Sequence, residues 1–339
     1  MVKQSCQYHL SRKLRVTPLM FITLLFSISV LSANSGILTF EAQGVGNYSG
    51  DDWNWYSHHL HDAMQKPSIG FDWLHRAGSG TRDWGYLSLQ SRLAYDESAP
   101  DKLRFQVYNA FLNYKSTYFD AWAGHNRTAL GVNSYLDNHA LLMPDNTMSG
   151  LNYDRDWGIG LKLNRQMPEV NLSLSTGSGM PLYIGDNYLL AGRIAYGDFA
   201  KDDVSLGLSA GTGKTLHSMG YIVMHNKKPL DYETIGIDFA KRHYNWVLMT
   251  DTLYGKYNNN SAYSSLFRLS GSFLQEDRLM AEAQVNYARL LGKSTRTFST
   301  GLSYKLNADI SLRGLYEFED VKNIHKTILQ IYYQKALVY

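Results

Sequence analysis

The strongest constraint on the fold is an alternation of apolar and polar residues with a period of two, which recurs along most of the chain after residue 36. The clearest segment places Glu282 and Gln284 between Ala281, Ala283 and Val285. We find no sustained helical stripe and no apolar run long enough for a transmembrane helix in this part of the sequence. The pattern therefore predicts many β-strands, each with one apolar and one polar face.

The first 33 residues have the features of a cleaved export signal. An apolar run at 19–31 is followed by small residues, and it is preceded by four cations, Lys3, Arg12, Lys13 and Arg15. This run is shorter than the roughly 20 residues that a membrane-spanning helix needs. We therefore predict a signal peptide at residues 1–33 and a single domain at residues 34–339.

The composition of the exported part excludes several classes of protein. Without the signal, 29 cations would face 30 anions, and a near-neutral chain lacks the basic surface of a nucleic-acid-binding protein. The single cysteine, Cys6, lies within the signal, so thiolate metal sites, iron–sulfur clusters and haem attachment are excluded. We expect no cofactor, no metal site and no nucleic-acid partner. The 25 tyrosines, against only 7 prolines, favour a strand-rich fold.

Sixteen strands are predicted when the alternating segments are counted from both ends of the chain. They are residues 37–46, 67–77, 82–95, 102–115, 118–125, 151–163, 169–176, 187–198, 203–211, 231–240, 244–254, 262–274, 279–290, 296–306, 309–318 and 326–339. The short apolar segment 221–224 is assigned to a connection, because counting it alone would make the number odd. An even number closes an antiparallel ring, so we predict an all-β, transmembrane antiparallel β-barrel of about 16 strands.

The predicted connections alternate between long and short along the chain. We expect the long ones on one rim, at 47–66, 96–101, 126–150, 177–186, 212–230, 255–261, 291–295 and 319–325. Long loops on one rim and tight turns on the other are typical of outer-membrane barrels. Tryptophans such as Trp53, Trp55, Trp84, Trp122, Trp157 and Trp246 are expected in the interfacial girdles, or in loops.

A barrel of this size encloses an aqueous lumen, whereas eight strands would be filled by side chains. The polar faces of the strands supply eight cations, Arg82, Arg92, Arg104, Lys162, Arg193, Arg268, Lys305 and Arg313, and four anions, Asp238, Glu282, Asp309 and Glu317. This excess predicts a pore with a mild preference for anions, reduced wherever a cation pairs with a neighbouring carboxylate.

The last predicted strand ends in an aromatic residue and carries an apolar ladder on one face. Its members are Leu329, Ile331, Tyr333, Leu337 and Tyr339. The arrangement resembles the signal that the barrel-assembly machinery recognises in outer-membrane proteins, and this resemblance implies that machinery as a partner.

One short motif resembles a pattern of phosphate-selective and related sixteen-stranded porins. The segment from Gly124 to Gly131 matches Gly-x-x-Lys/Arg-x-Pro-Leu/Phe-Gly at Arg127 and Leu130, although Ala129 replaces the proline. The resemblance implies that the following connection folds inward to narrow the channel, and it also implies a homotrimer. On this basis the candidate constriction residues are Arg127, Asp137, His139 and Asp145. A loop folded over the rim is the alternative.

These observations predict a Gram-negative outer-membrane porin, surrounded by lipid, that conducts small hydrophilic solutes without a chemical step. Similar barrels form the sleeve of porin–cytochrome electron conduits, so a sleeve for multihaem cytochromes is an alternative function. An outer-membrane enzyme is a second alternative, with His125, Asp137 and His139 as candidate catalytic residues.

Overall fold

The computed structural model describes residues 33–49, 52–54, 66–79, 82–96, 101–132, 142–163, 168–223 and 228–339. The predicted signal peptide, except for its last residue, lies outside the described residues. So do the candidate residues Asp137 and His139, and Trp55 of the predicted girdle.

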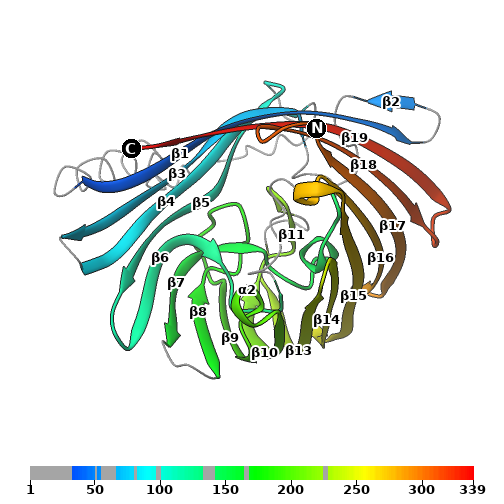
Figure 1. Ribbon diagram of the computed structural model, residues 1–339. Helices are drawn as coiled ribbons and strands as arrows, with labels where there is room; N and C mark the ends of the chain where they lie inside the picture. The colour runs from blue at the N-terminus through cyan, green and yellow to red at the C-terminus, as the bar shows by residue number, and fades with distance from the viewer. Residues whose placement is uncertain are drawn as a thin grey trace, which may run out of the picture.

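Sixteen long antiparallel strands form one closed ring (Figure 1). They are β1 (Ala33–Ser49), β3 (Ser68–Ser79), β4 (Arg82–Tyr95), β5 (Leu103–Lys115), β6 (Phe119–Arg127), β7 (Arg155–Leu163), β8 (Glu169–Ser175), β9 (Tyr188–Tyr196), β10 (Val204–Thr215), β13 (Leu230–His243), β14 (Trp246–Tyr257), β15 (Asn260–Phe273), β16 (Leu279–Leu290), β17 (Lys293–Lys305), β18 (Ile310–Glu319) and β19 (Ile324–Val338). The ring closes where β1 pairs with β19, from Ile37 opposite Val338 to Ser49 opposite Lys326. The predicted sixteen-stranded antiparallel barrel is confirmed.

Three further strands are short and are not members of the sixteen-stranded ring. β2 (Asp52–Asn54) pairs in antiparallel fashion with the last three residues of β1. β11 (Ser218–Met219) and β12 (Ile222–Val223) pair only with each other, in the connection between β10 and β13. The prediction that this segment does not form a barrel strand is therefore confirmed for residues 221–223, although the small hairpin there was not predicted; residue 224 lies outside the described residues.

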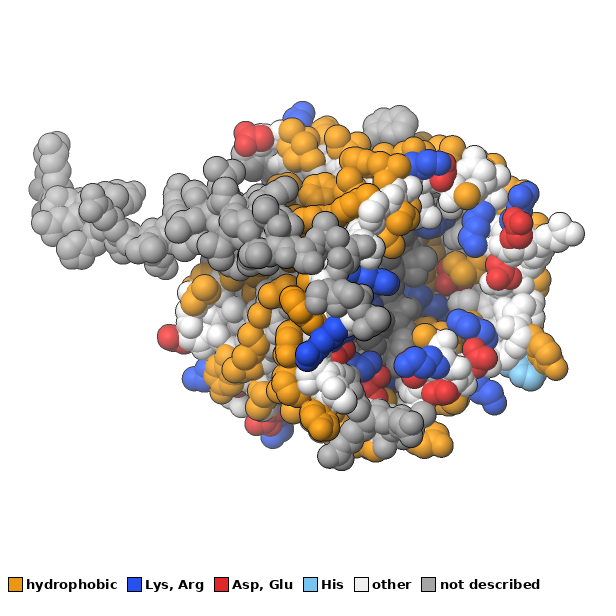
Figure 2. Space-filling model, turned by 60° about the vertical axis from the view of Figure 1, so that its left-hand side comes forward, with side chains coloured by type: hydrophobic (Ala, Val, Ile, Leu, Met, Phe, Trp, Pro, Cys, Tyr) orange, Lys and Arg blue, Asp and Glu red, His pale blue; other side chains and the backbone are white. Residues whose placement is uncertain are grey.

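The two faces of each strand have opposite polarity, with the apolar face turned outward. On β10, Leu206 and Leu208 are 46% and 57% exposed, whereas Ser205 and Ser209 are buried. Figure 2 shows the same distribution on the surface, where hydrophobic side chains cover the outer wall and charged ones surround a hollow. An exposed apolar wall around a polar interior is the arrangement that lipid requires.

The outward ladder of β19 follows the predicted alternation. Leu329, Ile331, Tyr333 and Leu337 are between 40% and 52% exposed. Beside it, the backbones of Gly36 and Tyr339 exchange two hydrogen bonds of 2.9 and 3.0 Å across the seam of the barrel. The indole N–H of Trp73, on β3, donates to the Tyr339 hydroxyl at 2.6 Å. The Tyr339 side chain therefore reaches past Gly36 on β1 and bonds to β3.

The prediction of long loops along one whole rim is only half right. The connections 50–67, 128–154, 176–187 and 216–229 are long, but β14 and β15 are joined by Asn258 and Asn259 alone. Both asparagines have positive φ angles, 50° and 61°, as a two-residue hairpin turn requires. Such turns continue the twist of the strands, so the strands extend into segments that we predicted as loops. The predicted connection at 291–295 likewise shrinks to Leu291 and Gly292.

Among the residues that the structure describes, helical structure is confined to short segments in the connections. They are η3 (Asn146–Ser149), α2 (Phe199–Asp202) and η5 (Gln275–Asp277). Within the described ranges, no helix combines the length and the apolar character that crossing a membrane requires.

Candidate pore constriction

The connection 128–154, between β6 and β7, folds into the barrel and reaches the far wall. Asn146 donates from Nδ2 to the Asp251 carbonyl on β14 at 2.7 Å, and its Oδ1 accepts from the Ser264 hydroxyl on β15 at 2.9 Å. β6 and β15 are the fifth and twelfth strands around the ring, so they lie almost opposite each other. The connection therefore crosses the lumen, as the motif resemblance implied.

A buried arginine holds the backbone of the crossing segment. Arg268 on β15 donates from Nη2 to the Pro144 carbonyl at 2.9 Å and from Nε to Gln284 Oε1 at 2.7 Å. Gln284 on β16 in turn donates to the Pro144 carbonyl at 2.7 Å. Arg268, which we predicted as a lumen residue, is 2% exposed and binds protein groups.

Apolar contacts fasten the same connection at two further places. At its start and end, Ala129, Leu130, Leu151 and Tyr153 pack into a cluster with Leu189, Ala191, Tyr232, Leu253, Tyr257 and Ala262 of the wall. Near its middle, Leu142 and Met143 pack against Val45, Leu315 and Ile328. These clusters lie inside the barrel, where most wall residues are polar, so they determine where the connection sits.

A second connection, 216–229, also folds inward, which the sequence did not predict. The Tyr221 hydroxyl donates to the Val107 carbonyl on β5 at 2.8 Å, and the Tyr221 and Tyr108 ring centroids are 6.2 Å apart. Burial raises the pKa of Tyr221 well above the usual value of 10.0, so the phenol remains a neutral donor. β11 accordingly lies inside the ring in Figure 1.

The two inward connections also contact each other. The Tyr153 hydroxyl donates to the Leu216 carbonyl at 2.8 Å. Gly150 lies close to the His217 ring, because a Cβ atom at Gly150 would be only 3.0 Å from His217 Nε2. The pair of connections therefore narrows the lumen as one packed unit.

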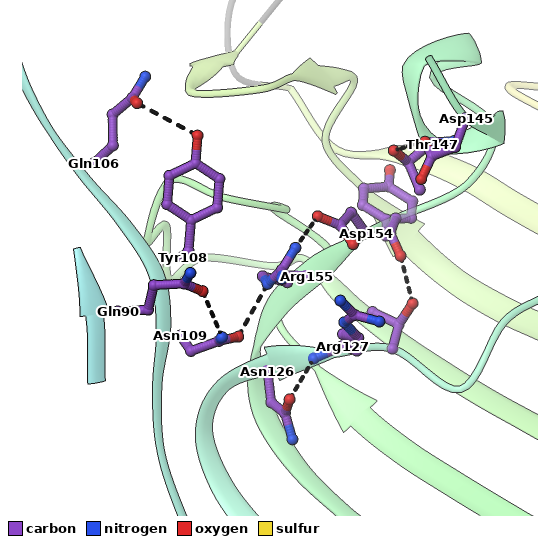
Figure 3. A network of polar contacts seen from close by, with 12 residues as sticks. Gln90, Gln106, Tyr108, Asn109, Asn126, Arg127, Asp145, Thr147, Asp154 and Arg155 are labelled. Atoms are coloured by element: carbon purple, nitrogen blue, oxygen red, sulfur yellow. Dashed lines mark hydrogen bonds and ion pairs between the residues drawn. The ribbon is translucent and has the colours of Figure 1, made fainter. Parts of the chain in front are cut away.

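A polar network joins this unit to β4, β5 and β7 (Figure 3). The guanidinium groups of Arg92 and Arg155 lie over the ring of Tyr108, with carbon-to-centroid distances of 4.2 and 5.8 Å. Arg155 also donates to Asn109 Oδ1 at 3.0 Å and forms an ion pair with Asp154. Because Tyr108 and Asn109 belong to the barrel wall, these contacts hold the two arginine side chains in place, and the arginines also contribute positive charge to the interior.

Several of the predicted lumen cations form ion pairs. Arg193 donates from Nη2 and Nε to the two carboxylate oxygens of Asp238, at 2.6 and 2.9 Å. The other pairs are Arg104 with Asp96 at 2.6 Å, and Lys162 with Glu169 at 2.7 Å. The net field inside the barrel is therefore weaker than the excess of cations in the sequence suggested.

The other predicted lumen residues occupy different environments. Glu282 accepts from the Ser270 hydroxyl at 3.2 Å, and Arg313 donates to Gln330 at 3.0 Å. Arg82 is exposed at the first residue of β4. Asp309 lies in the turn before β18, where it pairs with Lys335 at 2.8 Å on the rim.

The described candidate constriction residues have different surroundings. Arg127 borders a cavity of about 280 Å³ inside the barrel. Asp145 is buried, and its Oδ1 caps η3 by accepting from the Thr147 amide at 2.9 Å. Asp145 therefore shapes the connection, whereas Arg127 faces the open space.

The cavity also contains residues that we did not predict as site residues, above all Trp122 on β6. We expected this tryptophan in a girdle or a loop, which was wrong. Its neighbours Ala121 and Ala123 lie on the other face of the strand, and this alternation was the available signal. Trp53, Trp84 and Trp246, in contrast, are 62%, 44% and 43% exposed.

His125 is fully buried, and its ring centroid lies 4.8 Å from that of Trp157. No side chain in the described part of the chain is hydrogen-bonded to either ring nitrogen, so these residues form no base–nucleophile pair there. Within the described ranges, no three His, Cys, Asp or Glu residues are placed to hold a metal ion.

Comparison with solved structures identifies the fold of this chain. No protein-family model and no curated protein matches the chain. Among solved structures, it is similar to the anion-selective porin from Comamonas acidovorans, with a TM-score of 0.61 and 11% identity, covering 90% of this chain and 100% of that one. OmpF of Salmonella typhi in complex with daunomycin gives a TM-score of 0.64 at 11% identity, covering 88% and 97%. This chain has the porin fold.

A third similar structure is described as a trimer. It is in-vitro folded OmpT, an outer membrane protein of Vibrio cholerae, with a TM-score of 0.61 and 10% identity over 89% of this chain and 100% of that one. At these identities the likeness concerns the fold alone.

Proposed function

We propose that this protein is an outer-membrane channel of a Gram-negative bacterium, through which small hydrophilic solutes diffuse without a chemical step. The observation that carries the proposal is a closed sixteen-stranded barrel with an apolar outer wall and a polar, charged interior. Such a ring is wide enough for water, and the inward connections narrow it. The porin fold supports the same conclusion.

We assign the narrowing of the lumen to the connection 128–154. We propose that Arg127, the last residue of β6, lines the part of the lumen that this connection leaves open. Asp137 and His139 belong to the same connection and remain candidate constriction residues on sequence grounds. We expect at most a weak anion preference, because Arg104, Lys162 and Arg193 are paired with carboxylates. Reversal potentials in a salt gradient measure this preference, and Arg127→Ala should reduce it.

The interior favours a channel over a cytochrome sleeve. Both inward connections are fastened to the wall by buried hydrogen bonds and apolar clusters. A multihaem cytochrome inside the barrel would have to displace them. The enzyme alternative receives little support, since His125 has no catalytic partner among the described residues.

We propose two kinds of partner besides lipid. The apolar ladder of β19 is the segment through which the barrel-assembly machinery would recognise the chain. A homotrimer is proposed from the resemblance of the sequence motif and from the trimeric form of a protein with the same fold. Light scattering of the detergent-extracted protein tests the trimer, which a monomeric mass would exclude.

Recording from planar bilayers tests the channel. Purified protein should give discrete conductance steps in salt solution and should make vesicles permeable to small neutral solutes. If correctly folded, heat-modifiable barrels gave neither steps nor permeability, the channel would be rejected.

A further inference from the structure

The cavity beside Arg127 is enclosed on several sides within the barrel. Its volume of about 280 Å³ lies near the lower end of the range of small-molecule sites, about 300–1,000 Å³. Residues 128, 129 and 131 of the inward connection border it, and β4 to β9 supply the rest of its lining. Two bonds fix this part of the connection: the Ala129 amide donates to Ser173 Oγ at 3.1 Å, and Thr128 Oγ1 donates to the Tyr153 carbonyl at 2.6 Å.

Trp122 forms a flat apolar platform in this cavity. It pairs across the strands with Gly160 on β7, and a Cβ atom at Gly160 would collide with the indole. The missing side chain therefore lets the indole lie against the wall. Trp122 lines the cavity, so the ring also presents surface to the solution inside the barrel. An aromatic ring held in this way offers a large apolar contact at little entropic cost.

Neutral hydrogen-bonding groups surround the platform. Asn113, Asn126, Asn171 and Tyr86 all line the cavity. Asn126 accepts from the Arg127 amide through Oδ1, which leaves its NH₂ group available. Asn171 donates to Glu169 through Nδ2 at 2.6 Å, which leaves its carbonyl oxygen available. The cavity thus offers both donors and acceptors that carry no charge.

The cavity is lined by the cations Arg127, Lys162 and Arg193 and by the anions Asp120 and Glu169, and at least two of the three cations are in ion pairs. Lys162 pairs with Glu169 at 2.7 Å, and Arg193 pairs with Asp238 at 2.6 Å. A bound anion would have to compete with these carboxylates. A ligand with many hydroxyl groups and one apolar face meets no such competition, and its chemistry matches both the indole and the amides.

We propose that this cavity is a saccharide-binding subsite of the channel, in which one neutral sugar ring stacks on Trp122 while its hydroxyl groups bond to Asn113 and Asn126. The proposal rests on the proposed channel function and narrows it to a substrate class. A weak site of this kind concentrates sugar at the narrow part of the pore and still releases it to either side.

The test is block of single-channel current by maltotriose, with poly(ethylene glycol) of similar size as the steric control. In the wild type, maltotriose should interrupt the current in a saturable manner, whereas the polymer should not saturate. Trp122→Ala should weaken the block about tenfold when the block is expressed as a fraction of each variant's own current in plain salt. Trp122→Phe, which keeps an aromatic ring, should retain most of the block.

Trp246→Ala is the matched control, since Trp246 lies 43% exposed on β14 and is absent from the cavity. Maltotriose should block the current through this variant at the same concentrations as in the wild type. If Trp122→Ala does not fold, Asn113→Ala provides the comparison and should raise the half-blocking concentration, whereas Trp122→Phe should keep it close to the wild-type value. Normal conductance steps without saturable block would overturn the sugar site and leave the channel standing. Absence of any conductance would reject both.

Discussion

The half of the barrel from β1 to β10 and the half from β13 to β19 consist of similar strands but differ in their connections. In the first half and at its boundary, the connections are long, and two of them fold into the lumen and narrow it. In the second half, turns such as Asn258–Asn259 and Leu291–Gly292 contain two residues. The difference separates two tasks: the first half provides the narrowing of the pore, and the second provides most of the wall to which the connection 128–154 is fastened.

The largest effect is expected from Arg268→Ala, which removes a buried, charged attachment of the connection 128–154 to β15 and β16. Loss of the bonds to Pro144 and Gln284 should cost about 1.5–3 kcal/mol of unfolding free energy and increase the single-channel conductance. Urea unfolding in lipid vesicles and bilayer recording measure the two effects. The control is Arg296→Ala, whose exposed guanidinium lies 3.6 Å from Asp320 and should contribute little. Equal conductance in the two variants would show that the attachment does not control the pore.

A smaller effect is expected from Asn146→Ala, which removes one donor and one acceptor at the tip of the connection. Its loss should cost about 1–2 kcal/mol and make residues near 146 more accessible to proteases. Asn245→Ala is a matched control, because its amide donates to the Ser272 carbonyl at 2.9 Å in an exposed turn. If both variants lost stability equally, the interior attachment would be no stronger than a rim contact.

The tight turns of the second half can be tested with Asn259→Val. A β-branched residue at a φ of 61° should destabilise the barrel by about 1 kcal/mol and leave the conductance unchanged. Asn259→Gly, which tolerates this angle, should be at least as stable as the wild type. A changed conductance in either variant would show that the turn also influences the pore.

The smallest effect is expected at the opposite rim, where Asp198 caps the single turn of α2. Burial alone would raise its pKa, but the bonds from Lys201 and from the Ala200 amide outweigh it and hold the pKa below 3.8. Asp198→Ala should therefore cost about 0.5 kcal/mol near neutral pH. Because the native pKa is lowered, this contribution is present above 3.8 and lost as the pH falls through the native value. A difference from the wild type that persisted at low pH would contradict the cap.

The fold was predictable from the sequence because lipid imposes alternation on every strand. The strand count, the parity and the inward connection at 128–154 followed from that pattern and from one motif. The length of the second-half turns did not, since asparagine pairs such as Asn258–Asn259 suit both a loop and a two-residue hairpin. The site was less predictable. Arg268 looked like any lumen cation, and its role depends on a carbonyl more than a hundred residues earlier. Tyr221 and Trp122 depend in the same way on distant partners.

The crossing of the lumen has a consequence for how the chain matures. Asn146 meets Asp251 and Ser264 across separations of 105 and 118 residues, so these bonds form only after most strands have been synthesised and aligned. Once β1 pairs with β19, the closed ring surrounds the connection on all sides. If the ring closed while this segment was still outside, the β1–β19 pairing would have to open again, or the segment would have to enter through the mouth of the barrel. The order of events, insertion first and sealing second, is therefore built into the topology.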